Sequence, residues 1–97
     1  MKIHPLIRAL GAMVPGARFL ITSSHDWCSM TFSGQQLTVE CDIAATDFDR
    51  YSGYLANTLP DHEFLIPNML VADIAVVGQE NGSGTIKLLI EALVINA

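Results

Sequence analysis

Side chains that could do chemistry gather in two neighbouring stretches of the chain, residues 25–29 and 38–42. Within each stretch they recur at every second residue, which places them on one face of a β-strand. They are His25, Trp27 and Ser29 in the first stretch, and Thr38, Glu40 and Asp42 in the second. Ser33-Gly34, between the stretches, has the composition of a two-residue hairpin turn. Pairing across that turn sets His25 opposite Asp42 and Trp27 opposite Glu40.

This predicted cluster has two interpretations. A histidine beside a carboxylate can act as a general base or a pH switch, which would suit a small-ligand-binding or hydrolytic domain built on His25, Trp27, Glu40 and Asp42. A hydrolase also needs a positioned nucleophile, and Ser29 qualifies only by sharing the face. The simpler interpretation is a set of cross-strand polar pairs on a solvated sheet face, each contributing about 0.2–1 kcal/mol. We favour the simpler one and predict no catalytic residue.

Metal and redox patterns are incomplete in this sequence. Asp61, His62 and Glu63 are consecutive, so their side chains diverge and predict no metal site. Cys28 and Cys41 have neither zinc nor CxxC spacing. In the same register they are diagonal neighbours, about 7–8 Å apart between Cα atoms, which exceeds the usual disulfide span. We therefore expect two buried, unreactive thiols, a cytoplasmic protein, and neither a metal nor a cofactor.

Hydrophobic periodicity predicts the elements that carry these residues. Apolar side chains three and four residues apart indicate helices over residues 4–14 and 47–59. Residues 35–43 alternate strictly between apolar and polar, as a half-buried strand does. Its buried side consists of Leu37, Val39, Cys41 and Ile43. The stretch 17–32 is its predicted hairpin partner.

A second hairpin follows the second helix. Residues 69–79 and 85–96 are its strands, and the Gly- and Asn-rich segment 80–84 is its turn. The order αββαββ predicts a single α+β domain over residues 1–97. We expect a four-stranded antiparallel sheet made from two hairpins, with both helices on one face. This order is that of the ferredoxin-like βαββαβ arrangement with its first strand moved to the end. Two separate hairpins packed at an angle are the alternative.

The strands of the second hairpin are apolar on both faces, although two helices on one side can cover only one of them. The other face is therefore predicted to be an interface in a two-fold homodimer. Its residues are Val71, Asp73, Val77, Lys87, Leu89, Glu91, Leu93 and Ile95. The alternative is that the segment from Phe64 to Pro67 covers this face.

Composition supports the prediction of an assembly domain. Hydrophobic residues make up 51% of the chain and charged residues 15%, which is more apolar side chain than the interior of so small a domain holds. The net charge is −5, and five Lys and Arg residues cannot form the basic stripe that nucleic acid or an anionic membrane needs. We expect a small, non-enzymatic domain that self-associates through its sheet, with another protein partner also compatible.

Overall fold

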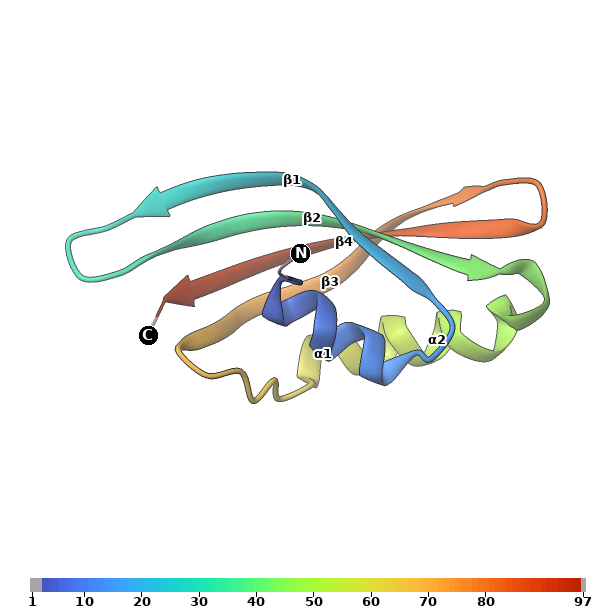
Figure 1. Ribbon diagram of the computed structural model, residues 1–97, viewed down its shortest axis with the longest axis horizontal. Coiled ribbons are helices and arrows are strands. Elements are labelled where there is room, and N and C mark those ends of the chain that lie inside the picture. Colours follow the sequence, from blue (N-terminus) through green and yellow to red (C-terminus); the bar gives the residue numbers. More distant parts are fainter. Residues whose placement is uncertain (1–2, 97) are drawn as a thin grey trace.

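A computed structural model describes residues 3–96, apart from the side chain of Ser52. The order of elements is αββαββ, as predicted (Figure 1). The elements are α1 (Pro5–Met13), β1 (Arg18–Cys28), β2 (Ser33–Ala44), α2 (Phe48–Thr58), β3 (Met69–Asn81) and β4 (Thr85–Asn96). Short 3₁₀ turns, Ala45–Asp47 and Leu59–Asp61, flank α2. The predicted single domain over 1–97 includes residues 1, 2 and 97, which lie outside the described residues.

Both helices form where the apolar spacing predicts them. His4 caps the start of α1, and its ring Nδ1 accepts a hydrogen bond from the Leu6 N–H at 3.1 Å. That bond satisfies one of the backbone donors left free at a helix start. Leu6 and Leu10 of α1 are fully buried, and so is Leu55 of α2. The periodic apolar stripe of each helix therefore faces the core.

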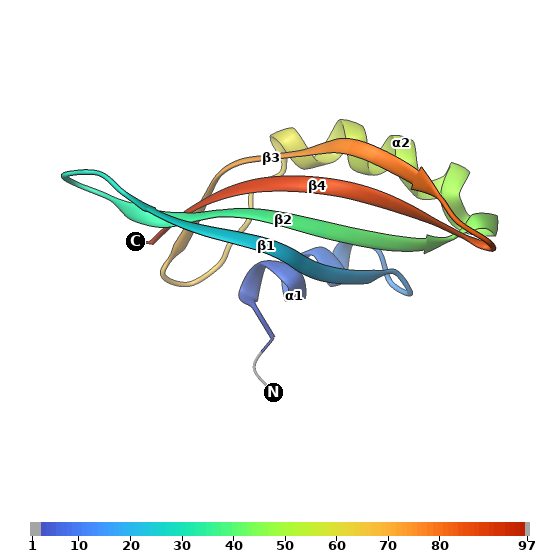
Figure 2. The same cartoon turned by 90° about the horizontal axis from the view of Figure 1, so that it is seen from above.

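The four strands form one antiparallel sheet in the order β1-β2-β4-β3. β2 and β4 pair continuously from Gly34–Ile95 to Ala44–Thr85, which excludes two separate hairpins. α1 and α2 lie on the same side of the sheet (Figure 1), α1 next to β1 and α2 next to β3 (Figure 2). β2 and β3 run parallel with β4 between them, so β2-α2-β3 is a split βαβ unit. Placing β4 ahead of α1 would create a second such unit, as in the ferredoxin-like arrangement.

The core lies between the helices and the alternate residues of the central strands. From β2 it takes Leu37, Val39, Cys41 and Ile43, and from β4 it takes Leu88, Ile90, Ala92 and Val94. Strict alternation in β2 correctly predicted its buried side. We call the helix side of the sheet the covered face and the opposite side the open face.

The turn of the first hairpin lies upstream of the predicted position. Cys28 pairs with Ser33, so Ser29–Phe32 form the turn, and Ser33-Gly34 begin β2. The Ser29 N–H donates to the Phe32 carbonyl at 2.7 Å, and the Phe32 N–H donates to Ser29 Oγ at 3.0 Å. A side-chain hydroxyl thus closes a turn that has no glycine. Gly34 is needed for another reason, because a Cβ there would overlap the Val94 carbonyl oxygen of β4.

Bulges change which residues of β3 face the core. Val71 pairs with Val94 and packs against the core, whereas Asp73 pairs with Leu93 on the open face. A second irregularity separates Val76 from Gly78. Each bulge inserts one extra residue and so reverses the inside-outside alternation that a regular strand would keep. The turn of this second hairpin lies within the predicted segment, with Gly84 at φ +80°.

Candidate functional site

Residues of all four strands line up in rows across the open face. The registers of the three strand pairs give the rows in the order β1, β2, β4, β3. From one end of the sheet to the other they are Arg18-Asp42-Lys87-Glu80, Leu20-Glu40-Leu89-Gly78, Ser23-Thr38-Glu91-Ala75, His25-Gln36-Leu93-Asp73 and Trp27-Gly34-Ile95-Leu70. The first row is all charged and the last has no charge, so we call these the charged end and the apolar end.

The predicted cluster of His25, Trp27, Glu40 and Asp42 does not form, and that prediction was wrong. Asp42 lies opposite Arg18, and His25 lies opposite Gln36. Gln36 and Asp42 are separated by about 20 Å along β2, at about 3.3 Å per residue. The cause is the turn at Ser29–Phe32, which shifts β1 along β2 by several residues relative to a turn at Ser33-Gly34.

The serine side chains have other partners than those predicted. Ser29, the nucleophile candidate, lies in the turn, and its hydroxyl bonds to the backbone of Phe32. Ser23 Oγ lies 3.2 Å from His25 Nε2 on the exposed edge strand β1. Their spacing of two residues on one strand face was the signal for this contact. Nothing encloses the pair among the described residues, so it has no pocket in which a substrate could be held.

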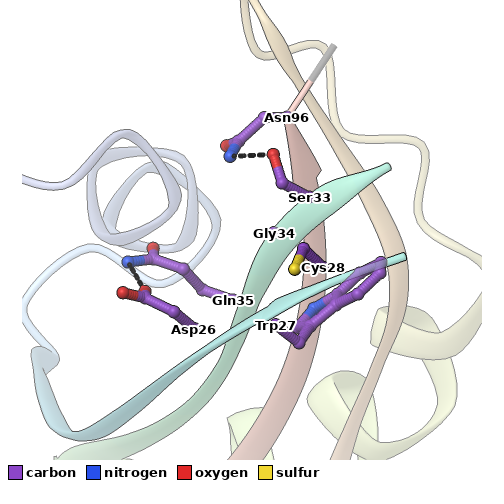
Figure 3. A pocket seen from close by; sticks show the side chains of 7 residues that line it. All are labelled: Asp26, Trp27, Cys28, Ser33, Gly34, Gln35 and Asn96. Atoms are coloured by element: carbon purple, nitrogen blue, oxygen red, sulfur yellow. Dashed lines mark hydrogen bonds between the residues drawn. The ribbon is translucent and has the colours of Figure 1, made fainter. Parts of the chain in front are cut away.

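A cavity of about 540 Å³ lies beside Trp27 (Figure 3), in the part of the first hairpin that extends past the helices (Figure 1). Its polar side chains bond to one another: Gln35 Nε2 donates to Asp26 Oδ1 at 3.2 Å, and Asn96 Nδ2 donates to Ser33 Oγ at 3.3 Å. The Trp27 Nε1–H is buried and has no hydrogen-bond partner among the described residues. Residues of both faces thus border the cavity, Trp27 from the open face and Asp26 and Gln35 from the covered face.

The two thiols differ in exposure, which corrects the prediction that both are buried. Cys41 is buried under the helices, whereas Cys28 is exposed at the end of β1. They are not diagonal neighbours, because Cys41 pairs with Phe19 and Cys28 with Ser33. Burial raises the pKa of Cys41 to about 12, and the neighbouring Asp42 carboxylate adds to the shift. Both thiols are free, as predicted.

Most residues of the predicted interface lie on the open face. Leu89, Leu93 and Ile95 of β4 are half-buried there. The charged residues Asp73, Lys87 and Glu91 lie on the same face, in the rows given above. Val71 was placed there wrongly, because the bulge at Ala72 turns it toward the core. Val77 is 55% exposed and lies at the second irregularity of β3.

Two exposed leucines on the open face were missed by the sequence argument. Leu20, on β1, is 62% exposed, and Leu70, which pairs with Ile95, is 55% exposed. Phe64 and Ile66 pack against the core on the helix side, so the segment from Phe64 to Pro67 does not cover the open face. Among residues 3–96 no element lies over that face (Figure 1).

Charges at the charged end alternate in sign across the strands. Lys87 Nζ lies 3.4 Å from Glu40 Oε2 in the next row. Arg18, Asp42, Glu80 and Lys87 also border a cavity of about 400 Å³ at this end. Positive side chains are thus separated by carboxylates, and the row presents no continuous positive surface.

Neither a metal-binding cluster nor a membrane-spanning helix is present in the part of the chain that the structure describes. No group of three His, Cys, Asp or Glu side chains is placed to hold a metal ion within residues 3–96. None of the described helices has the length and apolar character needed to cross a bilayer. Comparisons of the chain with known protein families, with curated proteins and with solved structures find no match.

Proposed function

We propose that this chain is a non-enzymatic assembly domain that self-associates through the open face of its sheet, as a two-fold homodimer. The observation that carries the proposal is an uncovered sheet face with an apolar end. Leu70 is 55% exposed at this end, beside the half-buried Ile95 and Leu93, and Leu20 is 62% exposed nearer the charged end, in the row of the half-buried Leu89. Isolated apolar side chains on a surface need no explanation, but a contiguous apolar patch on a sheet indicates a protein interface.

The energies are consistent with a concentration-dependent dimer. Complete burial of a leucine contributes about 1.5–3 kcal/mol, and each chain has two leucines with more than half of that surface still exposed. Four such side chains in a dimer contribute about 3–7 kcal/mol, to which the half-buried aliphatic residues add. Association costs about 4–15 kcal/mol. Because the terms are of similar size, the dimer should dissociate on dilution.

The charges support a protein partner rather than nucleic acid. The net charge is −5, and on the open face Arg18 and Lys87 are each flanked by carboxylates. A phosphate backbone needs an uninterrupted basic surface. An exposed free thiol at Cys28 is compatible with the reducing conditions of the cytoplasm, where we place the protein.

The test is the mass of the particle in solution as a function of concentration, measured by sedimentation. We expect a dimer at high concentration and a monomer for the double variant Leu89→Asp, Leu93→Asp, which should also be less stable. Leu65→Asp is the matched control, because Leu65 is 87% exposed but lies on the helix side. A wild-type chain that stays monomeric at high concentration would disprove the proposal.

The cavity beside Trp27 favours a second candidate function, binding of a small ligand. Pockets for small molecules combine apolar walls with a few polar groups, and this one offers an indole together with Asp26, Gln35, Ser33 and Asn96. Trp27 is the only tryptophan of the chain, so in dilute, monomeric protein its fluorescence reports on this cavity. A small-molecule screen by thermal shift, followed by fluorescence titration of each hit, tests the candidate. Hits that raise the melting temperature without changing the Trp27 emission would argue against binding in this cavity.

A further inference from the structure

We infer that the two-fold axis of the proposed dimer runs along the strands, so that the charged ends of the two sheets meet each other and the apolar ends meet each other. This inference rests on the proposed self-association and adds its geometry. Two sheets that pack face to face keep their strands within about 30° of parallel and lie about 10 Å apart. A two-fold axis between them can therefore run along the strands or across them.

The difference between the two ends of the open face selects the axis. An axis across the strands would set the charged end, with Arg18 and Lys87, over the apolar end of the partner subunit, which carries an indole and aliphatic side chains. Burying charges against apolar side chains removes their hydration without supplying a partner, which is strongly unfavourable. An axis along the strands places charges near charges and apolar side chains near apolar side chains.

The order of charges in the first row makes that arrangement self-complementary. Rotation about an axis along the strands reverses the strand order, so β1 faces β3 of the partner subunit and β2 faces its β4. The row Arg18-Asp42-Lys87-Glu80 reads positive, negative, positive, negative. In reverse it reads negative, positive, negative, positive. Arg18 then faces Glu80 of the partner subunit, and Lys87 faces Asp42 of the partner subunit.

Most contacts in the other rows also match in charge or in size under the same rotation. Glu40 is an exception, because it faces Leu89 of the partner subunit, but it keeps its ion pair with Lys87 of its own chain. His25 faces Asp73 of the partner subunit, and Trp27 faces Leu70 of the partner subunit. Glycines face large side chains, which suits the close packing of two sheets. Gly34 faces Ile95 of the partner subunit, and Gly78 faces Leu20 of the partner subunit.

Charge reversal tests this geometry through the outermost pair. Arg18 and Glu80 are both exposed, and neither belongs to an ion pair among the described residues, so replacing either leaves the fold intact. In a dimer of the Arg18→Glu variant, two carboxylates would meet at each of these contacts, and in a dimer of the Glu80→Arg variant two guanidinium groups would meet there. Like charges brought together across an interface cost several kcal/mol, so each variant alone should dimerise at least about tenfold more weakly than the wild type. A heterodimer of the two variants joins a carboxylate to a guanidinium group at both contacts under this axis, so mixing them should restore most of the wild-type affinity.

Combining both changes in one chain supplies a second rescue. In the double variant Arg18→Glu, Glu80→Arg, every contact again joins a carboxylate to a guanidinium group, with the two signs exchanged. Its dimer should therefore recover most of the wild-type affinity. Arg8→Glu and Glu63→Arg are the control changes, because both residues are exposed on the helix side or its connections. Neither control should alter the dimer by more than about twofold.

The readout is the dissociation constant of each dimer, measured by sedimentation at low salt and again at high salt. We expect two weakened single variants, a restored double variant, and smaller differences among all of them at high salt, because screening reduces the charge interactions. The axis is overturned if both single variants dimerise as tightly as the wild type, or if the double variant dimerises as weakly as the single ones. Either result leaves the proposed function standing. A monomeric wild type overturns both.

Discussion

The two faces of this sheet are built from the same strands, yet they differ in what protects them. On β4, Leu88, Ile90, Ala92 and Val94 point toward the helices, and Leu89, Leu93 and Ile95 point away from them. Both sides of β4 therefore carry several aliphatic side chains, and only one side is covered. Folding of the monomer requires the first set alone. The second set calls for a separate explanation, which the proposed dimer supplies.

β2 shows that an uncovered face need not be apolar. Its open side carries Gln36, Thr38, Glu40 and Asp42, while its covered side carries the core residues Leu37, Val39, Cys41 and Ile43. This is the usual pattern of an antiparallel strand with one solvent-exposed face. β4 pairs with β2 along its whole length and breaks that pattern. The apolar character of the open face is thus a property of particular strands and ends, and substitutions on the two faces should separate folding from assembly.

The largest expected difference between the two environments is in thiol labelling. Cys28 is exposed and should react with iodoacetamide at the rate of a free cysteine. Cys41 is buried and its pKa is raised to about 12, so it has little thiolate and reacts only after the sheet opens. With a folding free energy of about 5 kcal/mol or more, its labelling should be at least about 1,000-fold slower. Intact mass followed over time measures both rates.

In denaturant the two cysteines should label at the same rate, which calibrates that experiment. A doubly labelled product at early times in native buffer would show that the helices do not protect the covered face. The comparison between the two faces would then lose its basis.

The next largest effect comes from adjacent leucines on opposite faces. Leu88→Ala removes a side chain that is 3% exposed and leaves a cavity, so it should lower the free energy of unfolding by about 2–5 kcal/mol. Leu89→Ala leaves no closed cavity, because Leu89 is half-buried on the open face, and should cost about 1–2 kcal/mol. Urea denaturation of dilute, monomeric protein gives both values. Sedimentation should show that Leu89→Ala weakens the dimer.

Similar unfolding costs for the two leucines would mean that the open face is already covered within the monomer. A weakened dimer for Leu88→Ala at a concentration where that variant stays folded would also contradict the division of roles.

Periodicity in the sequence was sufficient to predict the helices, the strands and the fold class. Alternation over residues 35–43 predicted the core side of β2, and the 3.6-residue spacing predicted both helices, because burial of one face imposes those patterns. The Gly-rich segment 80–84 predicted its turn, because Gly84 adopts a positive φ that glycine tolerates best. These features depend on local chemistry, which a single sequence displays directly.

The rows of the open face could not be predicted, because they depend on register. Ser33-Gly34 resembles a turn, but the hydroxyl of Ser29 closes the actual turn. Gly34 is required instead because β4 approaches β2 too closely there for a Cβ. That shift separated His25 from Asp42 and dispersed the predicted site. The bulge that turned Val71 inward has no clear residue signature. The register between β2 and β4 joins distant parts of the chain, and no local pattern specifies it.

The smallest expected effects come from two glycines, one at the apolar end of the open face and one in the helix layer. A Cβ on Gly34 would overlap the Val94 carbonyl oxygen, so β2 and β4 must separate there. Gly34→Ala should therefore lower the free energy of unfolding by about 1–3 kcal/mol. Gly11 lies within α1, and a Cβ added to it would meet no atom within 4 Å. Alanine favours a helix over glycine by about 1 kcal/mol, so Gly11→Ala should stabilise the protein by up to that amount.

The two glycine variants should also differ in dimerisation. Gly34 is inferred to face Ile95 of the partner subunit, so separating β2 from β4 there should weaken the dimer as well as the fold. Gly11 lies on the far side of the sheet, and its replacement should leave the dimer unchanged. Thermal unfolding and sedimentation of both variants measure the two effects together. A Gly34→Ala protein that unfolds more easily but dimerises like the wild type would show that the apolar end lies outside the interface.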